Sequence, residues 1–140
     1  MPRKNIRLLR GQPLIAWTIA AALAAESLDR VVVSTEDEEI AQIARGLGAD
    51  VPFLRPGGLA GDEATTLSVL SHVISELEAL EGYRCDAVMT LQPTSPLRKT
   101  AHIDEAAALF ASDPQADSLV SCIPVPHIFH PRSVMKLDVQ

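Results

Sequence analysis

The stretch RVVVSTEDEEIAQIARGLG, residues 30–48, decides the fold class of this 140-residue chain. Its three consecutive valines predict a strand over residues 30–34 that is buried on both faces, as in a parallel sheet. Thr35 and Glu38 then form a capping-box pattern, and the acidic side chains at 36–39 favour the positive end of a helix. A strand is therefore followed directly by a helix that ends near Gly48, which is the order of an α/β protein.

The same alternation of strands and helices continues on both sides of this stretch. Apolar periodicity predicts further helices over residues 13–26, over 65–82 and from Thr100 onward. Apolar runs predict further strands over residues 86–91, 118–123 and, at the end, 134–139, and a short strand or extended segment over residues 51–54. This order predicts a mostly parallel sheet with helices on both faces. We expect residues 1–140 to form a single domain that is incomplete at its N- and C-terminus, because no strand precedes the first helix and the last strand only begins.

The composition narrows the class of protein. Aromatic residues make up 4% of the chain and hydrophobic residues 47%, which predicts an aliphatic core rich in alanine. The net charge of −6 argues against a general nucleic-acid binder, which would show a basic face. Cys85 and Cys122 are too few for a disulfide framework and predict two reduced, mostly buried thiols in a cytoplasmic protein.

One apolar run gives a competing signal. Residues 14–25, LIAWTIAAALAA, follow a basic start and have the pattern of a secretory signal, so export stays open as a minor alternative. Thr18 interrupts the run, and the valine strand follows at the distance expected within an α/β unit. The run is too short to span a bilayer, so we expect no membrane partner.

A rigid polar turn, LQPTSPLR at residues 91–98, follows the predicted strand 86–91. Pro93 and Pro96 exclude a helix and a central strand here. Open α/β sheets bind ligands outside the carboxyl ends of their strands, so the turn is a candidate site. We expect the amide of Gln92 to be buried, where it either braces the turn or recognises the hydroxyl groups of a substrate.

Other candidate ligand-binding residues have both a functional and a structural interpretation. Lys4 and Asn5 could hold phosphates or could belong to a frayed terminus. Arg55 could form a bidentate hydrogen bond with a phosphate or a base edge, or it could form a surface salt bridge. Thr65 and Thr66 could offer hydroxyls and a helix N-terminus to an anion, or could simply cap the helix. The sequence has no G-x-G-x-x-G or Walker A motif, which removes the main support for the common dinucleotide and P-loop interpretations.

Several segments occur together in an order that is typical of one family. They are Arg3–Asn5, Gly11–Ile15, Val32–Ala41, Leu54–Pro56 with Leu59–Asp62, and Leu91–Arg98. In these segments the chain resembles the acylneuraminate cytidylyltransferases, also called CMP-sialic acid synthetases. The run from Leu91 to Arg98 is the most specific of them, since many α/β proteins have a valine strand with an acidic cap.

The resemblance implies a Rossmann-like nucleotidyltransferase fold and transfer of CMP from CTP to a nonulosonic acid such as sialic acid, with release of pyrophosphate. It also implies Mg²⁺ as cofactor and a cytoplasmic homodimer. By match to the family's motifs, Lys4 neutralises phosphate charge as the catalytic residue, and Asn5 and Arg55 contact the nucleotide. Thr66 lies near the nucleotide, and Gln92 recognises the sugar acid.

The chain also departs from the family's pattern. The family places a strand and a glycine-rich loop before the segment that contains Lys4, and it places its Mg²⁺-holding aspartates beyond residue 140, so no metal ligand is assigned here. Position 36 is Glu where the family frequently has Asp. Two alternatives to a sialic-acid enzyme therefore stay open. One is a non-catalytic, truncated nucleotide-binding fragment, and the other is a cytidylyltransferase for a different acidic sugar.

Overall fold

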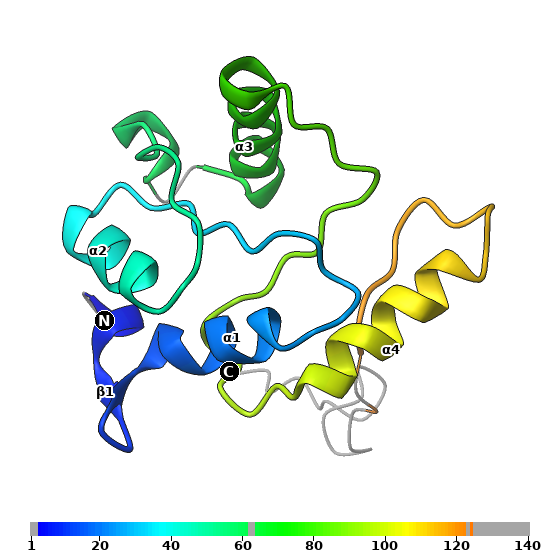
Figure 1. The fold of residues 1–140 in the computed structure, drawn as a ribbon, viewed down its shortest axis with the longest axis horizontal. Helices are drawn as coiled ribbons and strands as arrows, with labels where there is room; N and C mark the ends of the chain where they lie inside the picture. Colours follow the sequence, from blue (N-terminus) through cyan, green and yellow to red (C-terminus); the bar gives the residue numbers. More distant parts are fainter. Residues whose placement is uncertain (1–2, 62–63, 123, 125–140) are drawn as a thin grey trace, which may run out of the picture.

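The helices form where the apolar periodicity predicts them, as the computed structural model of residues 3–61, 64–122 and 124 shows (Figure 1). The elements follow in the order η1 (Lys4–Ile6), β1 (Leu8–Leu9), β2 (Gln12–Pro13), α1 (Leu14–Leu23), α2 (Glu38–Gly46), η2 (Gly57–Leu59), α3 (Thr66–Glu81) and α4 (Thr100–Ala111). Helix α3 begins at its cap Thr65, whose side chain accepts the Ser68 N–H at 3.1 Å, and it ends at Gly82 in the left-handed conformation with φ of 66°. Extended segments cross the middle of the view in Figure 1, with α3 on one side and α1 and α4 on the other.

The predicted parallel sheet is the main difference between sequence and structure. Within the described residues, hydrogen-bonded strands occur only as the antiparallel hairpin β1–β2, so the strands predicted over 86–91 and 118–122 are wrong as regular strands, and of the two possibilities for 51–54 the structure has the extended segment. The predicted strand 30–34 is reduced to a single parallel bridge between Val32 and Asp50. Residue 123 and the predicted strand 134–139 lie outside the described residues.

The sequence itself explains why the parallel pairing stops. The Asp50 N–H bonds the Val31 carbonyl at 2.9 Å, and the Val33 N–H bonds the Asp50 carbonyl at 2.8 Å, as in a parallel ladder. The next donor in that register is residue 52, which is a proline and has no N–H. Pairing resumes once, where the Arg55 N–H bonds the Thr35 carbonyl at 2.8 Å. The parallel direction of the two segments was therefore predicted correctly, but a continuous ladder was not.

Two small aliphatic clusters form the core, and α1 contributes to both. In the first cluster, Ile15 and Ile19 pack against buried alanines of α2 and against Val51. In the second, Ala22 and Ala25 pack against Ile103 of α4, which is 1% exposed, with Met89 and Leu91 beside them. Alanine and isoleucine dominate, as the composition predicted. Helix α1 thus ties the paired segments to α4.

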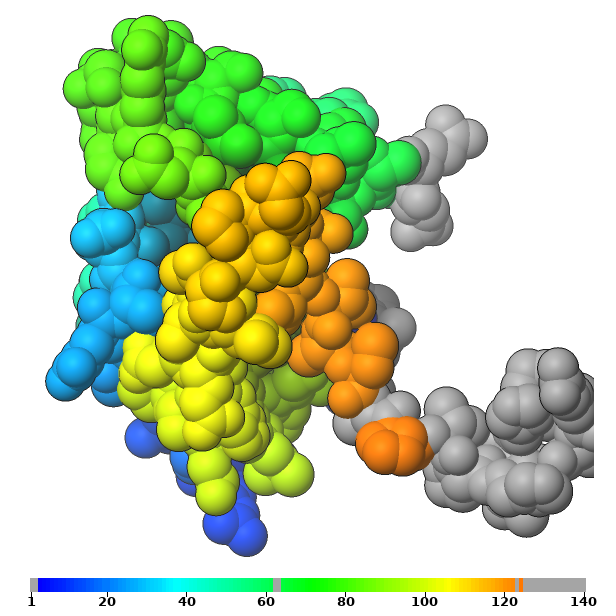
Figure 2. Space-filling view, turned by 90° about the vertical axis from the view of Figure 1, so that its right-hand side faces the viewer, coloured from blue at the N-terminus to red at the C-terminus, as the bar shows by residue number. Residues whose placement is uncertain are grey.

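The prediction that both thiols are mostly buried is wrong for one of them. Cys85 is half-buried, but Cys122 is exposed, and neither forms a disulfide. Cys122 belongs to the segment after α4, which Figure 2 shows in orange beside α4 (yellow) and below α3 (green). Among the described residues no helix has both the length and the apolar character needed to cross a membrane.

Replacing Ile103 with alanine is expected to lower the free energy of unfolding by about 2–4 kcal/mol, because it leaves a cavity where α4 meets α1. Urea denaturation measures the change. Leu109→Ala on the same helix is the control, since Leu109 is 63% exposed and its loss should cost about 0.5 kcal/mol or less. Equal losses from the two variants would contradict the placement of α4 on this cluster.

Candidate functional site

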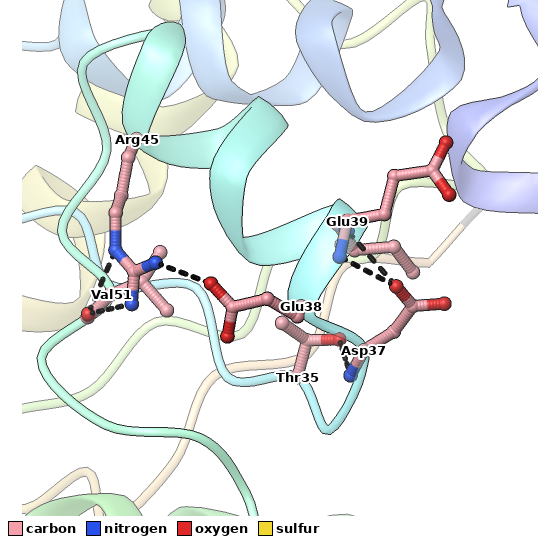
Figure 3. A network of polar contacts seen from close by, with 7 residues as sticks. Thr35, Asp37, Glu38, Glu39, Arg45 and Val51 are labelled. Carbon is pink, nitrogen blue, oxygen red and sulfur yellow. Dashed lines mark hydrogen bonds and ion pairs between the residues drawn. The ribbon is translucent and has the colours of Figure 1, made fainter.

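The end of the valine segment leads into the N-terminus of α2, and the chain there differs from the predicted capping box. Asp37, not Thr35, is the N-cap, and its carboxylate accepts the N–H groups of Glu39 at 2.9 Å and Ile40 at 3.2 Å (Figure 3). The buried Thr35 supports this cap, because its hydroxyl accepts the Asp37 N–H at 3.2 Å. An Asp can satisfy two of the unpaired amides of a helix start, which is why the helix begins two residues later than the capping-box pattern indicated.

We call residues Glu36, Asp37 and Glu39 the acidic cap. Two arginines from distant parts of the sequence converge on it. The Arg3 guanidinium pairs with Glu39 and lies 3.5 Å from an Asp37 carboxylate oxygen, and the Arg55 guanidinium pairs with Glu36. The cap therefore draws together the segment that carries Lys4 and Asn5 and the segment that carries Arg55.

The two ion pairs differ in burial. The side chains of Arg3 and Glu39 are 52% and 57% exposed, so their pairing contributes little to stability. The Arg55 side chain is only 20% exposed, and Glu36 is 42% exposed. Burial raises the pKa of Glu36, but the hydrogen bond from Arg55 and the guanidinium charge outweigh burial and hold this pKa below its usual value. The Arg55–Glu36 pair is the more strongly ordered of the two.

The three segments that meet at the acidic cap each carry a buried polar atom without a partner in the described structure. Asn5 Oδ1, Ser34 Oγ and Arg55 Nε are buried and have no hydrogen-bond partner among the described residues. Buried polar atoms normally have partners, so three such atoms on these segments favour a place where a polar ligand binds. Asn5 and Arg55 were predicted from the sequence, whereas Ser34 was missed. Its only signal was its position at the end of the valine run.

A fourth buried atom without a partner, His72 Nδ1, lies on α3. The His72 ring meets Phe53 edge-on, with 5.4 Å between the ring centroids. This contact packs α3 against the second extended segment.

The turn at residues 91–98 is braced by Arg98 rather than by the amide of Gln92. Both terminal nitrogens of Arg98 donate to the Gln92 carbonyl at 3.3 Å, and one lies 3.5 Å from the hydroxyl of the buried Thr18 on α1. Gln92 itself is exposed, so the prediction of a buried amide is wrong. Because the Gln92 side chain does not brace the turn, recognition of a ligand is the remaining interpretation of its role.

The structure brings only some of the predicted site residues to the acidic cap. Asn5 lies on η1 and Lys4 is exposed on the same turn, next to the acidic cap that binds Arg55. Thr66 is exposed at the start of α3, after its cap Thr65. In the part of the chain that the structure describes, no hydrogen bond or ion pair links Thr66 or Gln92 to the acidic cap.

The described residues do not fit a divalent cation. Their His, Cys, Asp and Glu side chains form no group of three that could hold a metal ion. The carboxylates of the acidic cap are already engaged, Glu36 and Glu39 by arginines and Asp37 by helix amides. They therefore do not offer Mg²⁺ the open oxygen ligands that it requires.

A shallow hollow of about 330 Å³ lies at the opposite end of the paired segments and has a structural explanation. Its Arg30 pairs with Asp50 at 2.8 Å and Glu81 at 2.6 Å and stacks 5.0 Å above the Tyr83 ring. The hydrogen bonds to Glu81 and Asp50 raise the pKa of Arg30 further above its usual value. Both carboxylates are matched to this cation, so the hollow has little capacity left for a charged ligand.

Comparisons with known proteins agree with the resemblance. A family model described as Cytidylyltransferase matches residues 1–138. The CMP-N,N'-diacetyllegionaminic acid synthase of Legionella pneumophila is 40% identical over 109 residues, which are 78% of this chain and 47% of that protein. The N-acylneuraminate cytidylyltransferase of Escherichia coli O18:K1:H7 is 38% identical over 118 residues, 84% of this chain and 27% of that protein.

A third relative is the pseudaminic acid cytidylyltransferase of Campylobacter jejuni serotype O:2, which is 39% identical over 97 residues, 69% of this chain and 41% of that protein. The chain thus spans about half, or less, of the length of the curated relatives that it matches. The family predicted from the motifs is confirmed.

Replacing Asp37 with alanine is expected to lower the free energy of unfolding by about 1–2 kcal/mol, because two amides at the start of α2 lose their acceptor. Asp37→Asn keeps an acceptor oxygen and should cost about 0.5 kcal/mol or less. Urea denaturation of both variants measures the difference. The assignment of the cap would be wrong if the alanine variant were as stable as the asparagine variant.

Proposed function

Because the chain belongs to the cytidylyltransferase family, we propose that its protein transfers CMP from CTP to a nonulosonic acid and releases pyrophosphate. The observation that carries this proposal is that the segments of Asn5 and Arg55 both reach the acidic cap, through Arg3 and Arg55, and that each segment has a buried polar atom without a partner among the described residues. Relatives named for diacetyllegionaminic, N-acylneuraminic and pseudaminic acid support the class of acceptor.

In this proposal the described residues bind and orient the two substrates. Asn5 accepts a hydrogen bond from the nucleotide through Oδ1, Arg55 donates one through Nε, and the exposed ammonium of Lys4 neutralises charge on the phosphates. Thr66 lies in the first turn of α3, where the helix dipole favours an anion. Gln92, exposed at the turn, recognises the sugar acid.

The reaction that fits these roles is an in-line attack of the anomeric hydroxyl of the sugar acid on the α-phosphate of CTP. The new bond joins that oxygen to phosphorus, the hydroxyl proton is released to solvent, the bond to the bridging oxygen breaks, and pyrophosphate leaves. The binding residues contribute by holding the reacting atoms in line and by neutralising charge. Mg²⁺, a homodimer and a cytoplasmic location belong to the proposal on the resemblance alone, and no step is assigned to the metal because the described carboxylates do not fit it.

CTP at about ten times its dissociation constant is expected to raise the melting temperature by about 3–6 °C, since binding to the folded state adds about 1.4 kcal/mol. Arg55→Ala should remove at least half of this shift, because a donor to the nucleotide is lost. Differential scanning fluorimetry measures both. Arg84→Ala is the matched control, since Arg84 is 83% exposed and forms only a surface pair with Glu78. Absence of any shift with millimolar CTP would count against the proposed function.

A panel of sialic, legionaminic and pseudaminic acids, assayed by pyrophosphate release, identifies the acceptor. Gln92→Ala is expected to raise the KM of the preferred acid about tenfold, the effect of one lost hydrogen bond, and to leave the KM of CTP within about twofold. An equal effect on both substrates would contradict the role of Gln92. Binding of CTP without pyrophosphate release would support the non-catalytic alternative.

A further inference from the structure

We propose that Glu36 is a positioning residue, which holds the Arg55 guanidinium in the orientation that binds the nucleotide. This inference rests on the proposed function and adds to it a residue that does not touch the substrate.

The backbone places the two residues beside each other. Glu36 directly follows Thr35, whose carbonyl accepts the Arg55 N–H at 2.8 Å. That bond joins the ends of the two extended segments, so the Glu36 and Arg55 side chains start from neighbouring points. The Glu36 carboxylate then accepts a hydrogen bond from the terminal Nη2 of Arg55. One end of the guanidinium is thereby held by a group of fixed position.

Burial makes this contact more effective than the other pairs around the cap. With 20% of its side chain exposed, Arg55 is more enclosed than Arg3 at 52% or Arg45 at 44%. An arginine side chain carries about 2 kcal/mol of rotamer entropy, which a ligand must otherwise suppress on binding. Glu36 restricts the Arg55 side chain before a ligand binds, while Nε of Arg55 still has no partner among the described residues.

A carboxylate at this place also has an unfavourable effect, because it repels the phosphates of CTP. The charge of Glu36 is compensated by the adjoining guanidinium, so the pair presents little net charge to a ligand. What the pair offers is a set of donors with a fixed direction. We therefore expect loss of orientation to outweigh relief of repulsion when Glu36 is removed.

The test measures the dissociation constant of CTP by calorimetry and its KM and kcat by pyrophosphate release. Glu36→Ala is expected to raise the dissociation constant and KM about 5–20-fold and to change kcat by about threefold or less, because the loss is one of preorganisation. Glu36→Gln keeps an acceptor oxygen at the same reach and should restore binding to within about threefold of the wild type.

Glu38→Ala is the matched control, because it removes the same charge two residues away, and its partner Arg45 otherwise donates to the Val51 carbonyl (Figure 3). It should leave CTP binding within about twofold of the wild type, since only a surface pair is lost. In an Arg55→Ala background, Glu36→Ala should add no further loss, since a positioning residue acts only through the group that it positions.

Three outcomes would overturn the inference. One is that Glu36→Ala binds CTP as well as Glu38→Ala does, and another is that Glu36→Ala and Glu36→Gln both bind more tightly than the wild type. The third is an additive loss in the Arg55→Ala background. If the wild-type protein does not bind CTP, the proposed function is wrong and the inference about Glu36 is wrong with it. If the wild-type protein binds CTP and one of the three outcomes occurs, only the inference about Glu36 is wrong.

Discussion

Three backbone hydrogen bonds between residues 31–35 and 50–55 hold the candidate site in place. Two of them form the bridge around Asp50, and the third joins Arg55 to Thr35. The first core cluster packs on the bridge, and the acidic cap begins one residue after the third bond. The position of Arg55 relative to α2 thus depends on a hydrogen bond between backbone atoms, in which no side chain takes part. Side-chain pairing at the cap then refines a geometry that the backbone has already set.

Helix α1 connects the paired segments to the turn at residues 91–98. One face of the helix packs Ile15 and Ile19 on the paired segments, and its C-terminal alanines receive Ile103 of α4. The turn at residues 91–98 is attached to the same helix through Arg98 and Thr18, and α4 through the bond from the Thr100 hydroxyl to the Ala21 carbonyl at 3.2 Å. A single alanine-rich helix therefore supports both the paired segments and the turn at residues 91–98, and its buried Thr18 contacts Arg98 of that turn.

Sequence reasoning recovered the helices and the family, because apolar periodicity and short motifs are local signals. It failed where one residue changes the hydrogen bonding of another segment. Pro52 interrupts the parallel ladder, yet its effect becomes visible only when the register opposite Val33 is known. Asp37 outcompetes Thr35 as cap because it satisfies two amides, which the capping-box spacing does not reveal. Glu36 could have been noticed as an acid in the run at 36–39, but its pairing with a residue 19 positions away could not.

The uneven distribution of charge makes a net charge of −6 compatible with the two anionic substrates that we propose. The first ten residues carry four cations and no acid. Arg3 is drawn to the acidic cap, whereas Lys4, Arg7 and Arg10 are exposed and form no ion pair within the described residues. Positive potential is therefore concentrated on η1 and β1, beside Asn5, while the acids of the cap are neutralised by arginines. Because exposed charges are screened beyond about 8 Å in physiological salt, this local balance, and not the total charge of the chain, sets the potential that an anion meets beside η1.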